Sequence, residues 1–549
     1  MSKVKGTSVR RGIAAAAITV SLVAQLGACG LMRETHPTPR MSVKEDASIS
    51  SESGATVEYG AEDMAYEMDE PMMPLAPDEG FEDFNTEEYD KLEETGFVSA
   101  ATRPLSTVSA DVDTASYANL RRMLRDGWTA EEIDAGAVRI EEMLNYFSYD
   151  YETPSGKDLF GVNVQVADCP WNDQTKLVTL GFATAPEADS ISEAGSNLVF
   201  LIDISGSMDS PDKLGLLKEA FGELVSNLDR NDRVSIVTYA GGEDVVLEGA
   251  RGTDRHKIMR AINRLRADGS TNGEAGLKMA YEVAQKNFIE GGVNRIVMAS
   301  DGDLNVGMSS ESDLHDYVDA QRETGIYLSV LGFGTGNYKD NKMETLADHG
   351  NGSYHYIDCV AEAERVLGER LTANLVPLAD DVKVQVEFNP AQVKGYRLIG
   401  YENRAMADED FRNDERDAGE VGPGAQFTVA YEVALADSEQ EIATTELKYG
   451  EKATGDATSD EWLTATVRYK PAKGGKVREQ TRAVGTGDVS RKPGEDWRFQ
   501  AAVIELGMLL RDSEYAGTAS YDEISDLLDG LELTDERAEL LDLADLALG

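Results

Sequence analysis

Apolar and polar positions follow two different patterns along this chain, and each pattern predicts a different kind of secondary structure. Between residues 196 and 375, short and almost wholly apolar runs take turns with longer stretches that carry one apolar stripe. Buried parallel strands have the first pattern, and helices packed on a sheet have the second. We therefore predict an α/β domain with a doubly wound, mostly parallel sheet. Its predicted strands are Leu198–Ile202, Val234–Tyr239, Val245–Leu247, Arg295–Ala299, Tyr327–Phe333 and Tyr354–Ile357.

Strict alternation of apolar and polar residues, which is typical of antiparallel strands, appears on both sides of this domain. It predicts an antiparallel β-sandwich over residues 376–485, and helical spacing predicts helices within the segment 106–190 and over residues 495–549. Because strand-rich stretches bracket the α/β domain, we hypothesise that they complete one sandwich into which this domain is inserted. The predicted strands of the flanks are Phe160–Val166, Leu177–Phe182, Val382–Phe388, Gln426–Val433, Thr444–Tyr449 and Leu463–Tyr469.

Residues 1–28 have the pattern of a secretory signal peptide. Four basic residues precede an apolar stretch from Ile13 to Leu26, which is short for a membrane span. The stretch ends in Leu26-Gly27-Ala28-Cys29, which resembles the lipobox of bacterial lipoproteins, so Cys29 is the expected lipidation site. Lipid chains anchor a protein to a membrane without spanning it. We expect an exported protein, lipid-anchored in the bacterial cell envelope at the outer membrane or the cell membrane; a cleaved signal with an incidental cysteine is the alternative.

Acidic residues dominate the composition, especially in residues 29–105, which are rich in Glu, Asp, Ser, Pro and Met. This stretch predicts a disordered acidic tether, although its Met and Phe residues also suit a partner-binding peptide. The whole chain has 101 Asp and Glu against 52 Lys and Arg, a net charge of −49, which argues against a nucleic-acid partner. The same acidity suits cation binding, solubility or a saline habitat. Cys169 and Cys359 are either two thiols or one disulfide.

Side chains with oxygen atoms gather where two predicted parallel strands end. Asp203, Ser205 and Ser207 follow the strand Leu198–Ile202 at alternate positions, and Asp301 follows a second strand. In open α/β sheets, ligands bind just beyond the carboxyl ends of the strands. Carboxylate and hydroxyl oxygens are the ligands that Mg²⁺ prefers. The sequence thus indicates a divalent-metal site, and the alternative is that the hydroxyls only cap the following helix.

A known family arranges the same motifs in the same order. The Asp203-x-Ser205-x-Ser207 motif, the loop Asp268–Asn272 and Ser300-Asp301-Gly302 resemble the metal-ion-dependent adhesion site of von Willebrand factor type A domains, so residues 196–375 are similar to such a domain, with its Rossmann-like sheet. The resemblance implies that Mg²⁺ or Mn²⁺ is bound, partly through water, and that an acidic residue of a partner protein takes an open coordination position. The implied metal ligands are Asp203, Ser205, Ser207, Thr271 and Asp301.

Further segments resemble a subfamily of bacterial exported proteins, in which the A domain lies between an N-terminal segment and a C-terminal domain of unknown function. The resemblance covers residues 105–549 and implies a metal-dependent, adhesion-type protein-binding module. One alternative is a cell-envelope assembly or chaperone component that works with an ATPase complex, and another is a hydrolase with its site in the C-terminal region. The segments are Asp111–Tyr117, Cys169–Asn172, Gly352–Tyr354, Tyr396–Arg404 and Gly507–Ser513.

Sequence motifs of other chemistries are incomplete. The chain has no G-x-S-x-G motif, phosphate-binding loop or H-E-x-x-H motif, so we expect no enzyme. The segment that begins at Asp301 resembles a calcium loop at first, but its sixth and twelfth positions are Val306 and Ser312. We expect the acidic loop 408–420 to be a solvated charge run and His355 to be packed in its strand.

Overall fold

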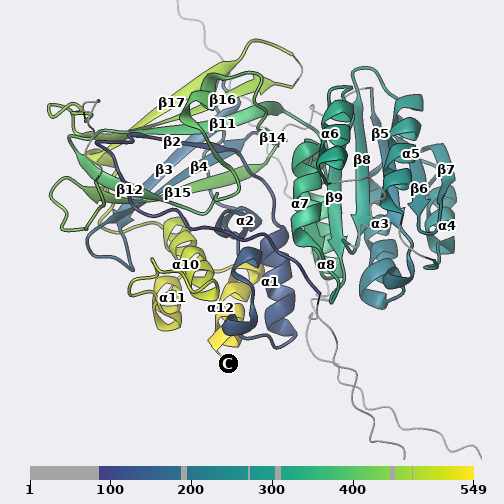
Figure 1. Ribbon diagram of the computed structural model, residues 1–549, viewed down its shortest axis with the longest axis horizontal. Coiled ribbons are helices and arrows are strands. Elements are labelled where there is room, and N and C mark those ends of the chain that lie inside the picture. The colour runs from purple at the N-terminus through teal and green to yellow at the C-terminus, as the bar shows by residue number, and fades with distance from the viewer. Residues whose placement is uncertain are drawn as a thin grey trace, which may run out of the picture. The chain divides into compact units, whose positions relative to one another are not determined.

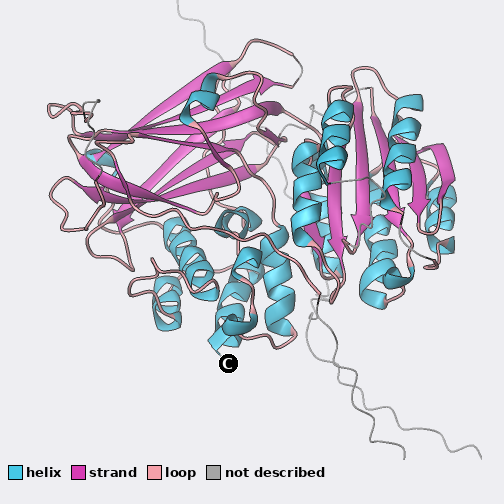
Figure 2. Cartoon of the chain, viewed as in Figure 1, coloured by secondary structure: helices cyan, strands magenta, loops and turns pink. Residues whose placement is uncertain are grey.

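We describe the protein from a computed structural model, which describes residues 86–186, 194–269, 272–302, 311–444, 452–472 and 474–548. Cys29, the signal peptide and most of the expected tether lie outside these residues. The described residues belong to one compact unit that begins at Glu82. Within it, one sheet is flanked by helices, two further sheets form a second region, and a group of helices accompanies them (Figure 2).

The α/β domain contains a six-stranded sheet with the order β10-β9-β8-β5-β6-β7. All neighbours pair in parallel except β6 and β7, which form an antiparallel hairpin at one edge. The strands are β5 (Ser196–Asp203), β6 (Arg233–Tyr239), β7 (Glu243–Arg251), β8 (Val293–Ser300), β9 (Tyr327–Phe333) and β10 (Tyr354–Ile357). This is the predicted doubly wound sheet.

Helices cover both faces of this sheet because its central strands are apolar on both sides (Figure 1). Along β5, Leu198 and Phe200 belong to the core beneath one set of helices, whereas Val199 and Leu201 belong to the core on the other face. One face carries α3 (Leu216–Asn227), α4 (Arg255–Arg264), α8 (Val360–Glu364) and α9 (Leu371–Leu375). The other carries α5 (Gly273–Lys286), α6 (Glu311–Arg322) and α7 (Asp340–His349).

Two stacked sheets form the β-sandwich, with the orders β1-β12-β15-β4-β3 and β13-β2-β11-β16-β17, and β14 pairs with β11. Strand β4, which precedes the α/β domain, pairs with β15, which follows it, over eight residue pairs from Lys176↔Val433 to Ala183↔Gln426. The hypothesis of one sandwich with an inserted α/β domain is therefore confirmed. The strands are β1 (Val98–Ser99), β2 (Leu105–Ser109), β3 (Phe160–Asp168), β4 (Lys176–Thr184), β11 (Ala379–Phe388), β12 (Val393–Ile399), β13 (Ala405–Met406), β14 (Gly419–Val421), β15 (Gln426–Leu435), β16 (Glu461–Pro471) and β17 (Arg478–Gly485).

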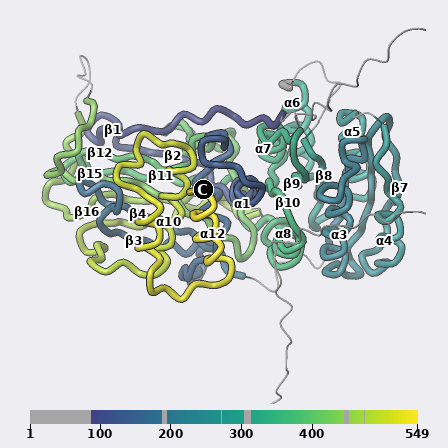
Figure 3. The backbone as a smooth tube through the Cα atoms, turned by 90° about the horizontal axis from the view of Figure 1, so that it is seen from below, coloured from purple at the N-terminus to yellow at the C-terminus, as the bar shows by residue number. Residues whose placement is uncertain are grey.

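A third core is built by helices from both ends of the described chain. Tyr117 and Leu144, which precede the α/β domain, share this core with Phe499 and Leu540 from the C-terminal helices. In Figure 3 the yellow α12 lies close to α1, and the two helices are in contact. The helices are α1 (Ala115–Arg125), α2 (Ile140–Tyr146), α10 (Glu495–Leu510), α11 (Tyr521–Leu528) and α12 (Asp535–Leu548).

The packed chain begins earlier than the expected boundary at residue 106. Val98 of β1 pairs with Tyr396 of β12, and Glu88 forms a parallel bridge with Lys339, so residues 86–105 are not part of a disordered tether. These backbone pairings form despite an acidic local composition. The predicted strand Thr444–Tyr449 falls almost wholly outside the described residues. Cys169 and Cys359 form no disulfide with each other. Among the described residues, no helix is both long and apolar enough to cross a membrane.

Candidate metal site

The parallel pairing of β5 and β8 brings the two predicted acidic ligands to the same edge of the sheet. Ile202 of β5 is the partner of Ala299 of β8, so the chain leaves both strands side by side. Asp203 is the last residue of β5, and Asp301 directly follows β8. Both side chains are 0% exposed. The site lies where an open α/β sheet is expected to bind its ligands.

Asp203 is fixed by hydrogen bonds from two segments. Its Oδ1 accepts the backbone N–H of Ser205 at 2.8 Å, and its Oδ2 accepts the Ser300 hydroxyl at 3.1 Å. Burial raises the pKa of Asp203 to about 6, although the hydrogen bonds from Ser205 oppose this shift. Within the described residues, Asp203 has no ion pair with a cationic side chain. A buried carboxylate of this kind fits a bound cation, which would stabilise its charged form.

The two serine hydroxyls connect the acidic residues. Ser205 Oγ lies 3.0 Å from Ser207 Oγ, and the Ser207 hydroxyl is hydrogen-bonded to the Asp301 carboxylate. Four of the five predicted ligands therefore come together in one cluster. The alternative role of these hydroxyls is not supported, since neither the short helix that begins at Gly206 nor the turn that begins at Pro211 has a side-chain hydrogen bond at its N-cap.

The fifth predicted ligand, Thr271, lies outside the described residues. The described part of its loop is held against the Asp203 segment by two backbone hydrogen bonds. Gly206 N–H donates to the carbonyl of Gly269 at 3.1 Å, and Asp268 N–H donates to the carbonyl of Ile204 at 2.8 Å. The loop that carries Thr271 thus starts beside the metal-site cluster.

Two residues that the sequence analysis missed also reach the cluster. Lys213 Nζ lies 3.1 Å from Asp301 Oδ2 and 2.7 Å from Asn337 Oδ1, and Asn337 Nδ2 donates to Asp301 Oδ2 at 3.0 Å. Burial alone would raise the pKa of Asp301, but the Lys213 ammonium and the hydrogen bonds lower it overall. The only sequence signal for Lys213 was its place ten positions after Asp203. Nothing in the sequence places Asn337 near either residue.

The donor set fits a hard divalent cation. It consists of two carboxylates and the hydroxyls of Ser205 and Ser207, which are the oxygen ligands that Mg²⁺ and Mn²⁺ prefer. No group of three or more His, Cys, Asp or Glu side chains suited to a metal occurs in the described part of the chain. Since hydroxyls complete this set, the site depends on the serines as well as on Asp203 and Asp301.

The segment that begins at Asp301 and resembles a calcium loop continues into residues 303–310, which lie outside the described residues. His355 is packed as predicted: it is 3% exposed, and its Nδ1 lies 2.9 Å from the Thr114 hydroxyl. Burial lowers its pKa to about 3, so the imidazole is neutral. The acidic loop 408–420 forms a short 3₁₀ helix and an ion pair between Asp414 and Arg468.

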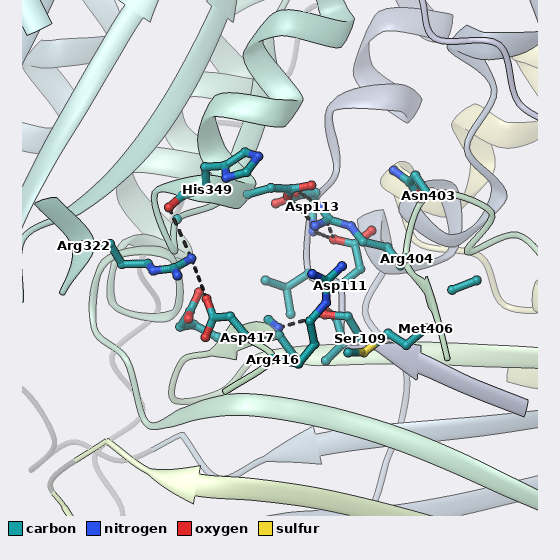
Figure 4. Close-up of a pocket in the computed structure, with 18 of the residues that line it drawn as sticks. Ser109, Asp111, Asp113, Arg322, His349, Asn403, Arg404, Met406, Arg416 and Asp417 are labelled. Carbon is teal, nitrogen blue, oxygen red and sulfur yellow. Dashed lines mark hydrogen bonds and ion pairs between the residues drawn. The ribbon is translucent and has the colours of Figure 1, made fainter. Parts of the chain in front are cut away.

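A separate polar cavity of about 430 Å³ is lined by residues of the α/β domain and of the sandwich (Figure 4). Its charged groups mostly pair with one another. Arg404 Nη2 lies 2.9 Å from Asp113 Oδ2, and Arg322 Nη1 lies 2.7 Å from Asp417 Oδ2. The Arg322–Asp417 pair joins α6 of the α/β domain to the sandwich region, so the cavity lies between the two domains.

The chain matches three family descriptions along most of its described length. Residues 197–366 match the von Willebrand factor type A domain. Residues 83–179 match a family described as von Willebrand factor, and residues 373–548 match the C-terminal region of YfbK. The domain order inferred from the sequence motifs agrees with these matches.

Individual proteins and a solved structure also resemble this chain. The YfbK protein of Escherichia coli (strain K12) is 40% identical over 478 residues, which cover 84% of this chain and 81% of that protein. The sll0103 protein of Synechocystis sp. is 30% identical over 167 residues, which cover 30% of this chain and 39% of that protein. A solved von Willebrand factor type A structure from Catenulispora acidiphila is 17% identical, with a TM-score of 0.39, and the match covers 69% of this chain and 88% of that one.

Proposed function

This chain belongs to the von Willebrand factor type A domain family that includes YfbK, and we propose that it binds another protein through a site occupied by Mg²⁺ or Mn²⁺. Domains of this type generally mediate metal-dependent protein interactions. The observation that carries the proposal is the convergence of Asp203, Ser205, Ser207 and Asp301 at one edge of the parallel sheet.

Each residue of the site has a specific task in the proposed interaction. Asp203 and Asp301 supply negative charge, and Ser205 and Ser207 supply neutral oxygen atoms, with Thr271 as a further proposed ligand. The bound ion would supply a positive centre with an open coordination position. A carboxylate from an Asp or Glu side chain of the partner suits that position, because it is a hard and negatively charged oxygen ligand.

The proposed location follows from the N-terminal sequence. A lipid on Cys29 would hold the protein at the membrane, and the acidic residues that follow would let the packed unit reach a partner at a distance from it. We propose a binding role for the chain and no catalysis; a hydrolase screen with and without a chelator tests this part of the proposal.

Metal titration of the full chain tests the site directly. We expect about one Mn²⁺ per chain, and we expect Asp203→Ala to weaken binding by roughly 100-fold or more, because loss of a direct ligand exceeds the effect of losing a supporting residue. Asp209→Ala is the matched control, since Asp209 is an exposed carboxylate in the same loop. Electron paramagnetic resonance of free Mn²⁺ gives the affinity. Equal Mn²⁺ binding by the wild type and a folded Asp203→Ala variant would rule out the site.

Capture of partners tests the function. The full chain is used as bait on solubilised cell envelope, in Mg²⁺ and in a chelator, with Asp203→Ala beside it. The proposal expects a protein that is retained only by the wild type in Mg²⁺. A partner retained equally under all three conditions would show that binding does not use the metal site.

A further inference from the structure

Lys213 places its ammonium group beside one of the acidic residues of the proposed metal site. It belongs to the turn Pro211–Gly215 that precedes α3, and its side chain is 7% exposed. Its Nζ lies 3.1 Å from Asp301 Oδ2, so the ammonium is the cationic partner of one of the two acidic ligands.

The position of this ammonium is built into the surrounding fold. Asn337 connects the pair, because its Oδ1 accepts from Lys213 and its Nδ2 donates to Asp301. The aliphatic part of Lys213 runs directly over Gly334, where φ is +78° and a Cβ atom would come 2.2 Å from the lysine Cε. Gly334 is itself held by the Tyr356 hydroxyl, which donates to its carbonyl at 2.9 Å. The close approach to Gly334 and the hydrogen bond to Asn337 therefore define the position of the lysine side chain.

The charge of the site depends on this lysine. With Asp203 and Asp301 ionised, the two carboxylates and Lys213 sum to −1, and a divalent ion changes this sum to +1. Without the lysine the same site would change from −2 to neutral. The lysine thus repels the incoming metal ion and leaves the metal-loaded site with a net positive charge, which attracts an anionic ligand.

We infer that Lys213 is the built-in counter-cation of the metal site, and that it weakens metal binding while making the loaded site selective for carboxylate ligands. This inference rests on the proposed metal-dependent function. The same charge couples the binding of the metal ion to the binding of the carboxylate. A carboxylate that neutralises the excess positive charge stabilises the bound metal ion, and by linkage the bound metal ion strengthens carboxylate binding to the same extent.

Neutral substitutions of Lys213 in the full chain test the inference. We expect Lys213→Met to bind Mn²⁺ about tenfold more tightly, and its Mn²⁺-loaded form to bind acetate about tenfold more weakly, since a unit charge at this range is worth at least that factor. Lys213→Arg should keep wild-type values. Lys218→Met is the matched control, because Lys218 is on the following helix and its Nζ donates to the Leu265 carbonyl at 3.0 Å. Paramagnetic resonance measures Mn²⁺ binding, and water proton relaxation measures acetate binding.

The outcomes separate the inference from the proposed function. Lys213→Gln keeps a hydrogen-bond donor without the charge, so it should behave like Lys213→Met, and it replaces that variant if the methionine chain does not fold. Both gains in Mn²⁺ affinity should shrink at high salt. If the wild type binds Mn²⁺ through Asp203 but neither neutral variant binds it more tightly, the role of Lys213 is wrong and the metal site stands. If neither the wild type nor any Lys213 variant binds Mn²⁺, both the role of Lys213 and the proposed metal site are wrong.

Discussion

Glu141 illustrates how burial decides the charge of a single residue in this protein. It lies in α2 and is 0% exposed. A Cβ atom on Gly400 would come 2.5 Å from its Oε2, so the carboxyl group fits only because that position is a glycine with φ of +72°. Burial, followed by the nearby Glu402 and Asp111 carboxylates, raises the pKa of Glu141 to about 8. The side chain is thus mostly protonated at pH 7.

This raised pKa predicts a pH-dependent loss of stability. The folded chain keeps the Glu141 proton between the ordinary value of 4.5 and about 8, whereas the unfolded chain releases it. The contribution of Glu141 to the free energy of unfolding is fully present below pH 4.5. It is lost as the pH rises through 8, by at most about 1.4 kcal/mol per pH unit. We expect Glu141→Gln to lose less stability than the wild type between pH 5 and 8 in urea unfolding. Glu152→Gln, at an exposed position, is the control; identical pH slopes for Glu141→Gln and the wild type would contradict the assignment.

At the scale of elements, residues 86–88 act as a short strap on the α/β domain. Thr86 N–H donates to the Gly336 carbonyl at 2.8 Å, and Glu88 N–H donates to the Tyr338 carbonyl at 3.0 Å. Between them, the Glu87 carboxylate makes two hydrogen bonds of 3.0 Å to Arg122 and accepts the Gly336 N–H at 2.9 Å. The strap therefore joins α1 to the loop that carries the metal-site residue Asn337.

Removing the charge of Glu87 should loosen this strap. Glu87→Gln leaves the buried Arg122 without its anion, and we expect a loss of ~3 kcal/mol in the free energy of unfolding. Burial raises the pKa of Glu87, but Arg122 and the other donors lower it overall, so this stabilisation is present above the ordinary value of 4.5 and is lost as the pH falls below it. Chemical unfolding at pH 7 and pH 4 measures both effects. Glu88→Gln, whose side chain is 52% exposed, should cost less than ~1 kcal/mol; equal losses for both variants would contradict the role of the strap.

At the scale of the whole molecule, the sandwich and the helical core each need both flanks of the inserted domain. Strand β15 lies between β12 and β4, and β11 lies between β2 and β16. Helix α10 contacts α2 through a close approach in which a Cβ atom on Gly507 would meet Ile140 Cγ1 at 2.7 Å. Without the segment that precedes the α/β domain, the C-terminal part of the chain therefore lacks strands and a helix against which it packs.

This dependence predicts the behaviour of a fragment. Residues 376–549 expressed alone should show no cooperative thermal transition and should be digested rapidly in limited proteolysis, because the fragment loses β2 and β4 and exposes the apolar face of α10. The chain from residue 86 to 549 is the control and should unfold cooperatively. Release of residues 376–549 from it as a protease-resistant unit would contradict the shared sandwich.

The hydrophobic pattern located the buried elements more accurately than the exposed ones. The predicted bounds of β9 and β10 agree with the structure, because both are short, mostly apolar runs whose residues are nearly all buried. Strand β17 was missed, since its sequence is mostly polar and half of its residues are exposed at the sheet edge. Strand β12 was missed because the buried Arg397 interrupts its alternation; that arginine is paired with Glu432 of β15 at 3.1 Å.

The parallel sheet and the oxygen donors at its edge can be predicted from the amino-acid sequence alone. Asp203 and Asp301 lie at the carboxyl ends of two strands, and Ser205 and Ser207 come shortly after the first, so parallel pairing of those two strands is enough to bring all four to one edge. The contacts of Lys213 and Asn337 with these residues, and the single sandwich formed by both flanks of the inserted domain, became apparent only in the three-dimensional structure. These arrangements depend on which distant segments come into contact and on how far their side chains extend. The spacing of hydrophobic residues along the chain carries no information about either.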